Sequence, residues 1–235
     1  MGRKYIVVHI DKGSFKQLTH GEYPFILKKK TKDYMVKTLE HLMNSRIRIL
    51  YGYTHNNEFS LLFVKDKNIS LEEYEKLSTL FSNDASEKFL ELLNNKDEGD
   101  FDCQIIQLPN LDLVEKYFIW EQDKAKINVL NNYCYLKLKE EGLSGRKALT
   151  ILEKLNMTEK NEFILKKGID FESIPLWEKR GVGIYWEKYM EEVFNPKKNR
   201  SFGTLCKRLK IVYELPVEND YTVFIQSLFK QNNQS

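Results

Sequence analysis

The stretch YGYTHNNEFSLLF at residues 51–63 decides the fold. β-Branched and aromatic residues in Arg46–Tyr53 and Phe59–Val64 predict two strands. The residues between them, Thr54–Glu58, are rich in turn formers, so the two strands should form a β-hairpin. The elements before and after this hairpin then identify the fold.

The flanking elements complete a βαββαβ order. Tyr5–Ile10 is short, apolar and β-branched, which is typical of a buried central strand. Asp33–Asn44 has its apolar residues at helical spacing, and a second helix should begin at a capping box formed by Ser70 and Glu73. Phe101–Leu108 supplies the fourth strand. This order predicts an α+β, ferredoxin-like sheet with both helices on one face.

The predicted topology brings distant polar residues together. The first and third strands should be antiparallel neighbours at the centre of the sheet. Asp11, at the end of the first strand, should therefore lie beside the turn formed by Asn56, Asn57 and Glu58. Hard divalent cations prefer oxygen ligands, which a carboxylate next to a polar turn supplies. Asp11 is the first candidate metal ligand; the alternative is an aspartate that only caps the following loop.

The second half of the chain is mainly helical by its pattern. Leu113–Lys139 predicts a long helix, and Arg146–Leu155 a short one after a break at Leu143-Ser144-Gly145. Gly168–Glu214 is mixed. We predict a palm-like domain at residues 1–110 and an extension at residues 111–235, packed together as one unit.

Composition is that of a globular protein. The 235 residues are 42% hydrophobic and 30% charged, and a net charge of +3 leaves a nucleic-acid partner open without requiring one. Cys103, Cys134 and Cys206 lack zinc-type spacing and predict free thiols. No apolar run has the roughly 20 residues of a membrane span. We expect a cytoplasmic protein with no membrane contact.

Six landmarks in order resemble one known family, and they cover residues 5–190. The first two are HIDKGSF at residues 9–15 and the hairpin at residues 51–63. The others are FDCQIIQLP at 101–109, YFIWEQDKAKINVLNN at 117–132, KNEFILKKGIDF at 160–171, and Lys179-Arg180-Gly181. Together they resemble the histidine-tRNA guanylyltransferases and their bacterial and archaeal relatives, which have a polymerase-type palm.

The resemblance implies an unusual reaction. Members of this family extend tRNA in the 3′–5′ direction. They activate the tRNA 5′ end with a nucleoside triphosphate, and the 3′-hydroxyl of an incoming nucleotide then attacks it. The expected substrates are tRNA, GTP and ATP, with two Mg²⁺ ions as cofactors. Some relatives repair truncated 5′ ends, and the family implies a homo-oligomer, a dimer or a tetramer.

The resemblance also implies roles for individual residues. Asp11, Lys12 through its backbone carbonyl, and Asn57 would contact metal. Lys160 would be catalytic together with Asp11. The triphosphate would be bound by Asp11, Lys12, Gly13, Ser14, Phe15 and Lys16, with Asn56 and Asn57. Activation and RNA contacts would involve Lys126, Asn128, Asn132 and Asn161.

Several positions depart from the family pattern. Asn57 stands where the family has its second metal-binding aspartate, and a lost charge should weaken metal binding by several kcal/mol. Three interpretations remain open: weakened catalysis, Glu58 acting as the substitute ligand, or a catalytically inactive copy. Lys126 replaces a histidine that is associated with activation, and Lys12 replaces a glycine.

Two further surfaces have competing interpretations. The basic residues from Lys197 to Lys210 either contact tRNA phosphates or form a solvated face. Trp120 is predicted to lie in the core rather than to stack on bases. At the level of the whole chain, the alternative to an active enzyme is a degenerate relative that binds tRNA or nucleotide without catalysis. A cyclic-nucleotide synthase is disfavoured because the second-half motifs belong to the tRNA family.

Overall fold

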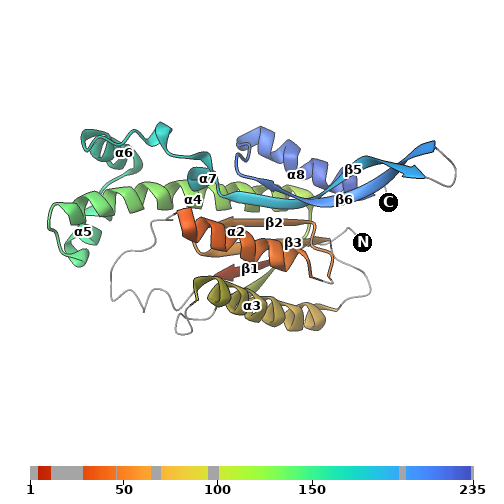
Figure 1. The fold of residues 1–235 in the computed structure, drawn as a ribbon. Helices are drawn as coiled ribbons and strands as arrows, with labels where there is room; N and C mark the ends of the chain where they lie inside the picture. The colour runs from red at the N-terminus through yellow and green to blue at the C-terminus, as the bar shows by residue number, and fades with distance from the viewer. Residues whose placement is uncertain are drawn as a thin grey trace.

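The computed structural model describes residues 5–11, 29–45, 47–64, 70–94, 101–195 and 200–233. They form a six-stranded antiparallel sheet in the order β4-β1-β3-β2-β5-β6 (Figure 1). The first half contains β1 (Tyr5–Asp11), α2 (Lys29–Met43), β2 (Tyr51–His55), β3 (Glu58–Val64), α3 (Leu71–Leu93) and β4 (Asp102–Leu108). The second half contains α4 (Leu111–Glu140), α5 (Gly145–Leu152), α6 (Met157–Lys166), a 3-10 turn (Phe171–Ser173), α7 (Leu176–Arg180), β5 (Val182–Asn195), β6 (Arg200–Val212) and α8 (Glu218–Asn233).

The predicted βαββαβ arrangement is confirmed. β1 lies between β3 and β4 and is antiparallel to both. Alternate residues of β1 point to opposite faces of the sheet, as the period of a strand requires. Ile6, Val8 and Ile10 pack against α2 and α3 in one core cluster. Tyr5 and Val7 belong to a second cluster on the other face, which α4 and α8 cover.

The hairpin turn is shorter than the sequence predicted. Only Asn56 and Asn57 lie in the turn, while His55 and Glu58 are paired strand residues. Asn56 has a φ of 48°, and asparagine tolerates this left-handed conformation better than most residues. The strand pairing therefore continues to the last residue before the turn, and both flanking side chains are fixed on the sheet.

The capping box at the start of α3 is confirmed. The Ser70 side chain accepts a hydrogen bond from the Glu73 backbone N–H, and the Glu73 carboxylate accepts one from the Ser70 N–H. These two bonds satisfy backbone donors that a helix leaves free at its start.

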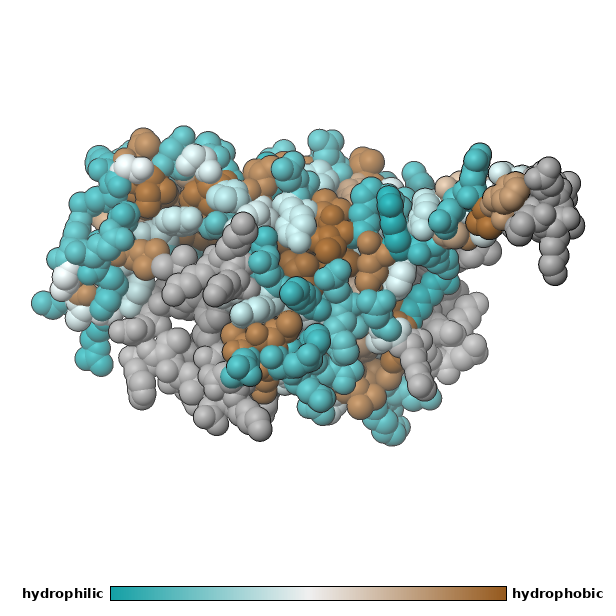
Figure 2. All heavy atoms as spheres, viewed as in Figure 1, coloured by the Kyte–Doolittle hydropathy of each residue, from teal (hydrophilic) through white to brown (hydrophobic). Residues whose placement is uncertain are grey.

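The second half is mainly helical and also extends the sheet. The far end of α4 packs with α5 and α6 around a third apolar cluster. β5 pairs with β2, and the β5–β6 hairpin projects beyond the body of the molecule (Figure 1). Its outer part exposes Met190, Phe194 and Leu205. Figure 2 shows apolar surface among polar residues on the projecting arm. Among the described residues, no helix is both long enough and apolar enough to cross a membrane.

Candidate functional site

Four polar residues form a row across neighbouring strands. Asp11 on β1 is directly opposite Glu58 on β3 and Asp102 on β4, and Glu58 is opposite His55 on β2. Directly paired residues of antiparallel strands point to the same face of a sheet. The row therefore places three carboxylates side by side, an arrangement in which like charges repel one another unless cations intervene.

Two charged side chains of helix α4, Glu121 and Lys124, contact residues of this row. The side chain of Glu121 is only 1% exposed, and its Oε2 lies 2.9 Å from Nε2 of His55. The Lys124 ammonium donates to Glu58 Oε2 at 2.8 Å and to Glu121 Oε2 at 3.2 Å. Because Glu121 and Lys124 are three residues apart on the helix, both reach the same end of the sheet.

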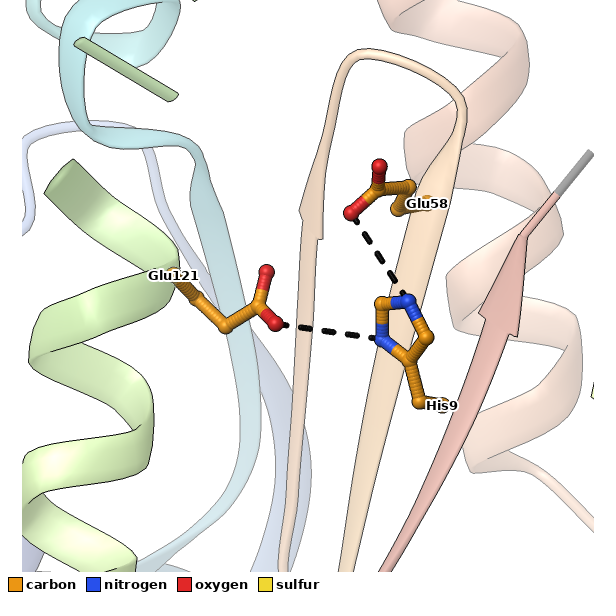
Figure 3. Close-up of side chains that lie close together, drawn as sticks. All are labelled: His9, Glu58 and Glu121. Carbon is orange, nitrogen blue, oxygen red and sulfur yellow. Dashed lines mark ion pairs between the residues drawn. The ribbon is translucent and has the colours of Figure 1, made fainter. Parts of the chain in front are cut away.

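His9 lies at the centre of the site (Figure 3). Its Nε2 is 3.8 Å from Glu58 Oε2 and 3.9 Å from Asp11 Oδ2, and its Nδ1 is 3.9 Å from Glu121 Oε1. These separations are too long for hydrogen bonds. The Tyr117 hydroxyl, 3.2 Å from Nδ1, is within hydrogen-bonding distance. Burial lowers the pKa of His9 despite the surrounding carboxylates, so the ring is neutral at pH 7.

The buried carboxylate of Glu121 is ionised. Burial by itself would raise its pKa, but the hydrogen bond from His55 and the charges of His55 and Lys124 outweigh burial and lower the pKa to about 2. An ionised carboxylate only accepts hydrogen bonds, so Nε2 of His55 is the donor. Burial would likewise lower the pKa of Lys124, but its contacts with Glu58 and Glu121 raise it instead.

The residues present fit a hard divalent cation. Asp11, Glu58 and Glu121 carry three negative charges, and Lys124 together with a protonated His55 supplies at most two positive charges, so the site retains negative charge. The Asp11 side chain is 36% exposed and that of Glu58 is 25% exposed, so both carboxylates are accessible. Oδ1 of Asn57 is buried and accepts no hydrogen bond from any described residue, which leaves an amide oxygen free for a cation.

The structure brings some of the predicted site residues together. Asp11 and Glu58 are in register, and Asn56 and Asn57 form the adjacent turn. The predicted phosphate loop, Lys12–Lys16, lies outside the described residues. Of the basic stretch, residues 196–199 also lie outside them.

Other predicted residues follow the helices away from the carboxylates. Lys126, Asn128 and Asn132 lie further along α4. Lys160 and Asn161 are on α6, where the backbone carbonyl of Lys160 accepts a hydrogen bond from the Cys134 thiol. Cys134 is about 15 Å along α4 from Lys124 at 1.5 Å per residue. The described residues thus do not place Lys160 beside Asp11.

Sequence reasoning missed much of the site. It did not single out His9, His55, Glu121 or Lys124. An available signal was the parity of β1, since His9 and Asp11 are two residues apart and must share a face. The prediction that Trp120 is buried was wrong. Its side chain is 55% exposed, with the Lys124 ammonium 4.5 Å from the ring centre.

Comparison with known proteins shows which family the chain resembles. The tRNAHis guanylyltransferase family model matches residues 1–109, and the model of the Thg1 C terminal domain matches residues 112–214. A tRNA(His) guanylyltransferase of Candida glabrata is 26% identical over 193 residues, which cover 75% of this chain and 80% of the relative.

Solved structures share the fold. A bacterial tRNA(His) guanylyltransferase (Thg1)-like protein in complex with ATP matches with a TM-score of 0.70 at 22% identity, covering 97% of this chain and 91% of that one. Such a protein in complex with GTP matches with a TM-score of 0.65 at 23% identity, covering 97% and 90%. Because the two family models together span most of the sequence, the chain belongs to the tRNAHis guanylyltransferase family.

Proposed function

We propose that this protein is a metal-dependent nucleotidyltransferase that adds GTP-derived nucleotides to the 5′ end of tRNA in the 3′–5′ direction. The observation that carries the proposal is the pairing of Asp11 with Glu58 at the strand ends, in a chain of this family. Bacterial proteins of the same fold are in complex with GTP and with ATP, which supports these two nucleotides as substrates.

Asp11, Asn57, Glu58 and the backbone carbonyl of Lys12 would hold Mg²⁺. The ion would lower the pKa of the attacking hydroxyl and neutralise the leaving pyrophosphate. Within the chain, Glu58 replaces the charge that Asn57 lacks. Its carboxylate must then exchange the Lys124 ammonium, 2.8 Å away, for the metal.

The remaining predicted residues would bind nucleotide and RNA. We propose that Lys12–Lys16, Asn56 and Asn57 bind the triphosphate. Lys126, Asn128 and Asn132 on α4 and Asn161 on α6 would contact the RNA or assist activation. For Lys160 we retain the role of a catalytic residue as a prediction, to be tested by substitution.

A second candidate function is binding of tRNA or nucleotide without catalysis. The observation that favours it is that two acids of the site, Glu58 and Glu121, are already bound by cations. Lys124 already binds Glu58 and Glu121, and His55 binds Glu121. If the ammonium is never displaced, the site lacks a second acidic ligand for metal.

Incorporation of labelled GTP decides between the two functions. Full-length and 5′-truncated tRNA transcripts are incubated with the protein and Mg²⁺ or Mn²⁺. The wild-type chain is compared with Asp11→Ala and with Asp123→Ala, which removes an exposed carboxylate from α4. We expect incorporation by the wild type and by Asp123→Ala, and at least a roughly thousandfold loss in Asp11→Ala, equivalent to about 4 kcal/mol.

No incorporation by the wild type with any tRNA or metal, together with retained tRNA binding, would reject the enzymatic proposal in favour of the binding function. Equal activity in Asp11→Ala and the wild type would reject Asp11 as the metal ligand.

Three broader properties are also proposals. We propose that residues 1–110 form the catalytic domain and residues 111–235 an extension packed against it, in line with the pairing of β2 with β5. We propose a cytoplasmic location, in line with the unpaired cysteines, and a homo-oligomer, a dimer or tetramer, by resemblance to the family. Sedimentation of the purified chain tests the oligomeric state.

A further inference from the structure

A cavity of about 360 Å³ lies at the end of β2 that is remote from Asp11. Arg48 and Leu50, just before β2, form one wall. Trp186 and Lys188 on β5, Lys207 on β6 and Leu228 on α8 form the others. Residues of α8 and of the β5–β6 hairpin, which run side by side in Figure 1, thus line the same cavity.

This cavity is separate from the carboxylate row. His55, at the other end of β2, belongs to that row. Leu50 precedes His55 by five residues, about 17 Å along an extended strand at 3.3–3.4 Å per residue. A small ligand therefore cannot reach both places at once.

Positive charge gathers at the mouth of the cavity. Lys188 and Lys207 are directly opposite one another on β5 and β6, and Arg48 adds a third cation. Like charges that face each other across a strand pair are destabilising. Within the described part of the chain, Lys207 forms no ion pair.

The acid nearest along β5 does not neutralise this group. Glu187 does not line the cavity. Its carboxylate accepts hydrogen bonds from Arg208 at 2.7 Å and from Lys210 at 2.5 Å. Glu187 is thus engaged by Arg208 and Lys210 and does not pair with Lys188 or Lys207.

Most of the remaining lining is apolar, with Tyr185 and Gln231 as its polar members. Leu50 and Leu228 are buried core residues, and the indole of Trp186 is partly buried. The Lys188 ammonium is fixed at the rim because it donates to the Gln231 carbonyl at 2.7 Å. An apolar lining with a few placed cations is typical of pockets for small ligands, and the volume falls in their range of roughly 300–1,000 Å³.

We propose that this cavity binds a nucleoside phosphate, either as a free nucleotide or as the 5′-phosphorylated end of an RNA strand. The base lies against Trp186 and the leucines, and the phosphate relieves the repulsion between Lys188 and Lys207. The site is independent of the carboxylate row and of the proposed transferase activity.

Calorimetric titration of the full chain with GMP tests the proposal. EDTA in the buffer removes divalent cations, so nucleotide binding that depends on metal at Asp11 does not contribute. Lys207→Met removes a cavity cation. Lys210→Met removes the same charge from a residue of β6 that does not line the cavity and is the matched control. We expect saturable binding of GMP to the wild type. Lys207→Met should weaken the affinity about tenfold, because one charge-assisted hydrogen bond is lost. Lys210→Met should leave the affinity unchanged within about twofold.

A 5′-phosphorylated dinucleotide and its unphosphorylated form distinguish the two sources of the ligand. Tighter binding of the phosphorylated dinucleotide than of GMP supports an RNA end. Tighter binding of GMP supports the free nucleotide. No saturable binding of either, or equal loss in the two lysine variants, would overturn the proposal. Since no incorporation is measured, this result is independent of whether the transferase activity exists.

Discussion

Glu121 is the buried acid at which the cations of the site converge. His55 and Lys124 both bind its carboxylate, and these contacts hold α4 against the ends of β2 and β3. Without its partners, a buried carboxylate would be strongly unfavourable. The same contacts keep the acid ionised, which ties the stability of the fold to the chemistry of the site.

The first prediction concerns pH and Glu121. The folded-state pKa of about 2 lies below the ordinary value of 4.5, so the ionised group stabilises the fold fully above pH 4.5. This contribution is lost as pH falls toward 2. Glu121→Gln should therefore have a lower free energy of unfolding than the wild type at pH 7. At pH 3 the difference in free energy of unfolding between the two proteins should be smaller than at pH 7 by roughly 2 kcal/mol, because the wild type has lost that much stabilisation. Urea unfolding at both pH values measures this, and a pH-independent difference would contradict it.

The second prediction concerns Asn57. Asn57→Asp adds a carboxylate to the turn next to Glu58, where the Oδ1 of Asn57 is buried and accepts no hydrogen bond from a described residue. Affinity for a divalent cation should rise at least about tenfold, since one added charge supplies more than about 1.4 kcal/mol at short range. Calorimetry with Mn²⁺ measures this, with Asn44→Asp as control, because Asn44 is an exposed residue just after α2. Unchanged affinity would exclude Asn57 from the metal site.

At the scale of elements, the β2–β3 hairpin aligns the site. Its two-residue turn keeps His55 and Glu58 paired, and Thr54 adds a hydrogen bond from its hydroxyl to the Glu58 carbonyl at 2.8 Å. At the neighbouring start of β5, the backbone of Arg180 and Gly181 lies close to the side chain of Tyr53. The Tyr53 hydroxyl donates to the Arg180 carbonyl at 3.0 Å, and Gly181 packs against the Tyr53 ring.

The third prediction follows from this approach. Gly181 has a φ of 74°, and a Cβ there would lie 2.6 Å from the Tyr53 ring. Gly181→Ala should destabilise the fold by roughly 2 kcal/mol or more, combining backbone strain with steric overlap. Gly168→Ala is the control, because Gly168 also has a positive φ but no atom near its Cβ. Thermal and urea unfolding compare the two, and equal losses would show that the contact with Tyr53 contributes nothing.

At the scale of the whole molecule, the buried apolar residues form three clusters that stabilise the fold. Two of them lie on opposite faces of the sheet, and the third joins the far end of α4 to α5 and α6. The sheet is built from strands distant in sequence, whereas the third cluster spans one continuous part of the chain. This division allows the α5–α6 part to open without the sheet.

The fourth prediction tests this division. Ile164 on α6 is fully buried in the third cluster. Ile164→Ala should cost roughly 2–5 kcal/mol locally. Hydrogen exchange should then accelerate in α5 and α6 while β1 and β3 keep their protection. Equal acceleration in the sheet would contradict a separable unit.

The sequence determined the elements whose patterns are local. The apolar run of β1, the capping box at Ser70 and the order of strands and helices in the first half follow from propensity and spacing. The pairing of Asp11 with Glu58 also followed, because the βαββαβ order fixes which strands are neighbours. The shared motifs gave the family.

Only the tertiary structure decided the composition of the site. Glu121 and Lys124 come from a helix whose register over the sheet depends on packing, which no local pattern encodes. Sequence spacing predicted a buried Trp120, yet the indole is exposed beside Lys124, because burial of a helix face depends on what packs against it. The lysine pair Lys188 and Lys207 likewise became visible only through strand register, since a long hairpin brings residues nineteen positions apart into direct opposition.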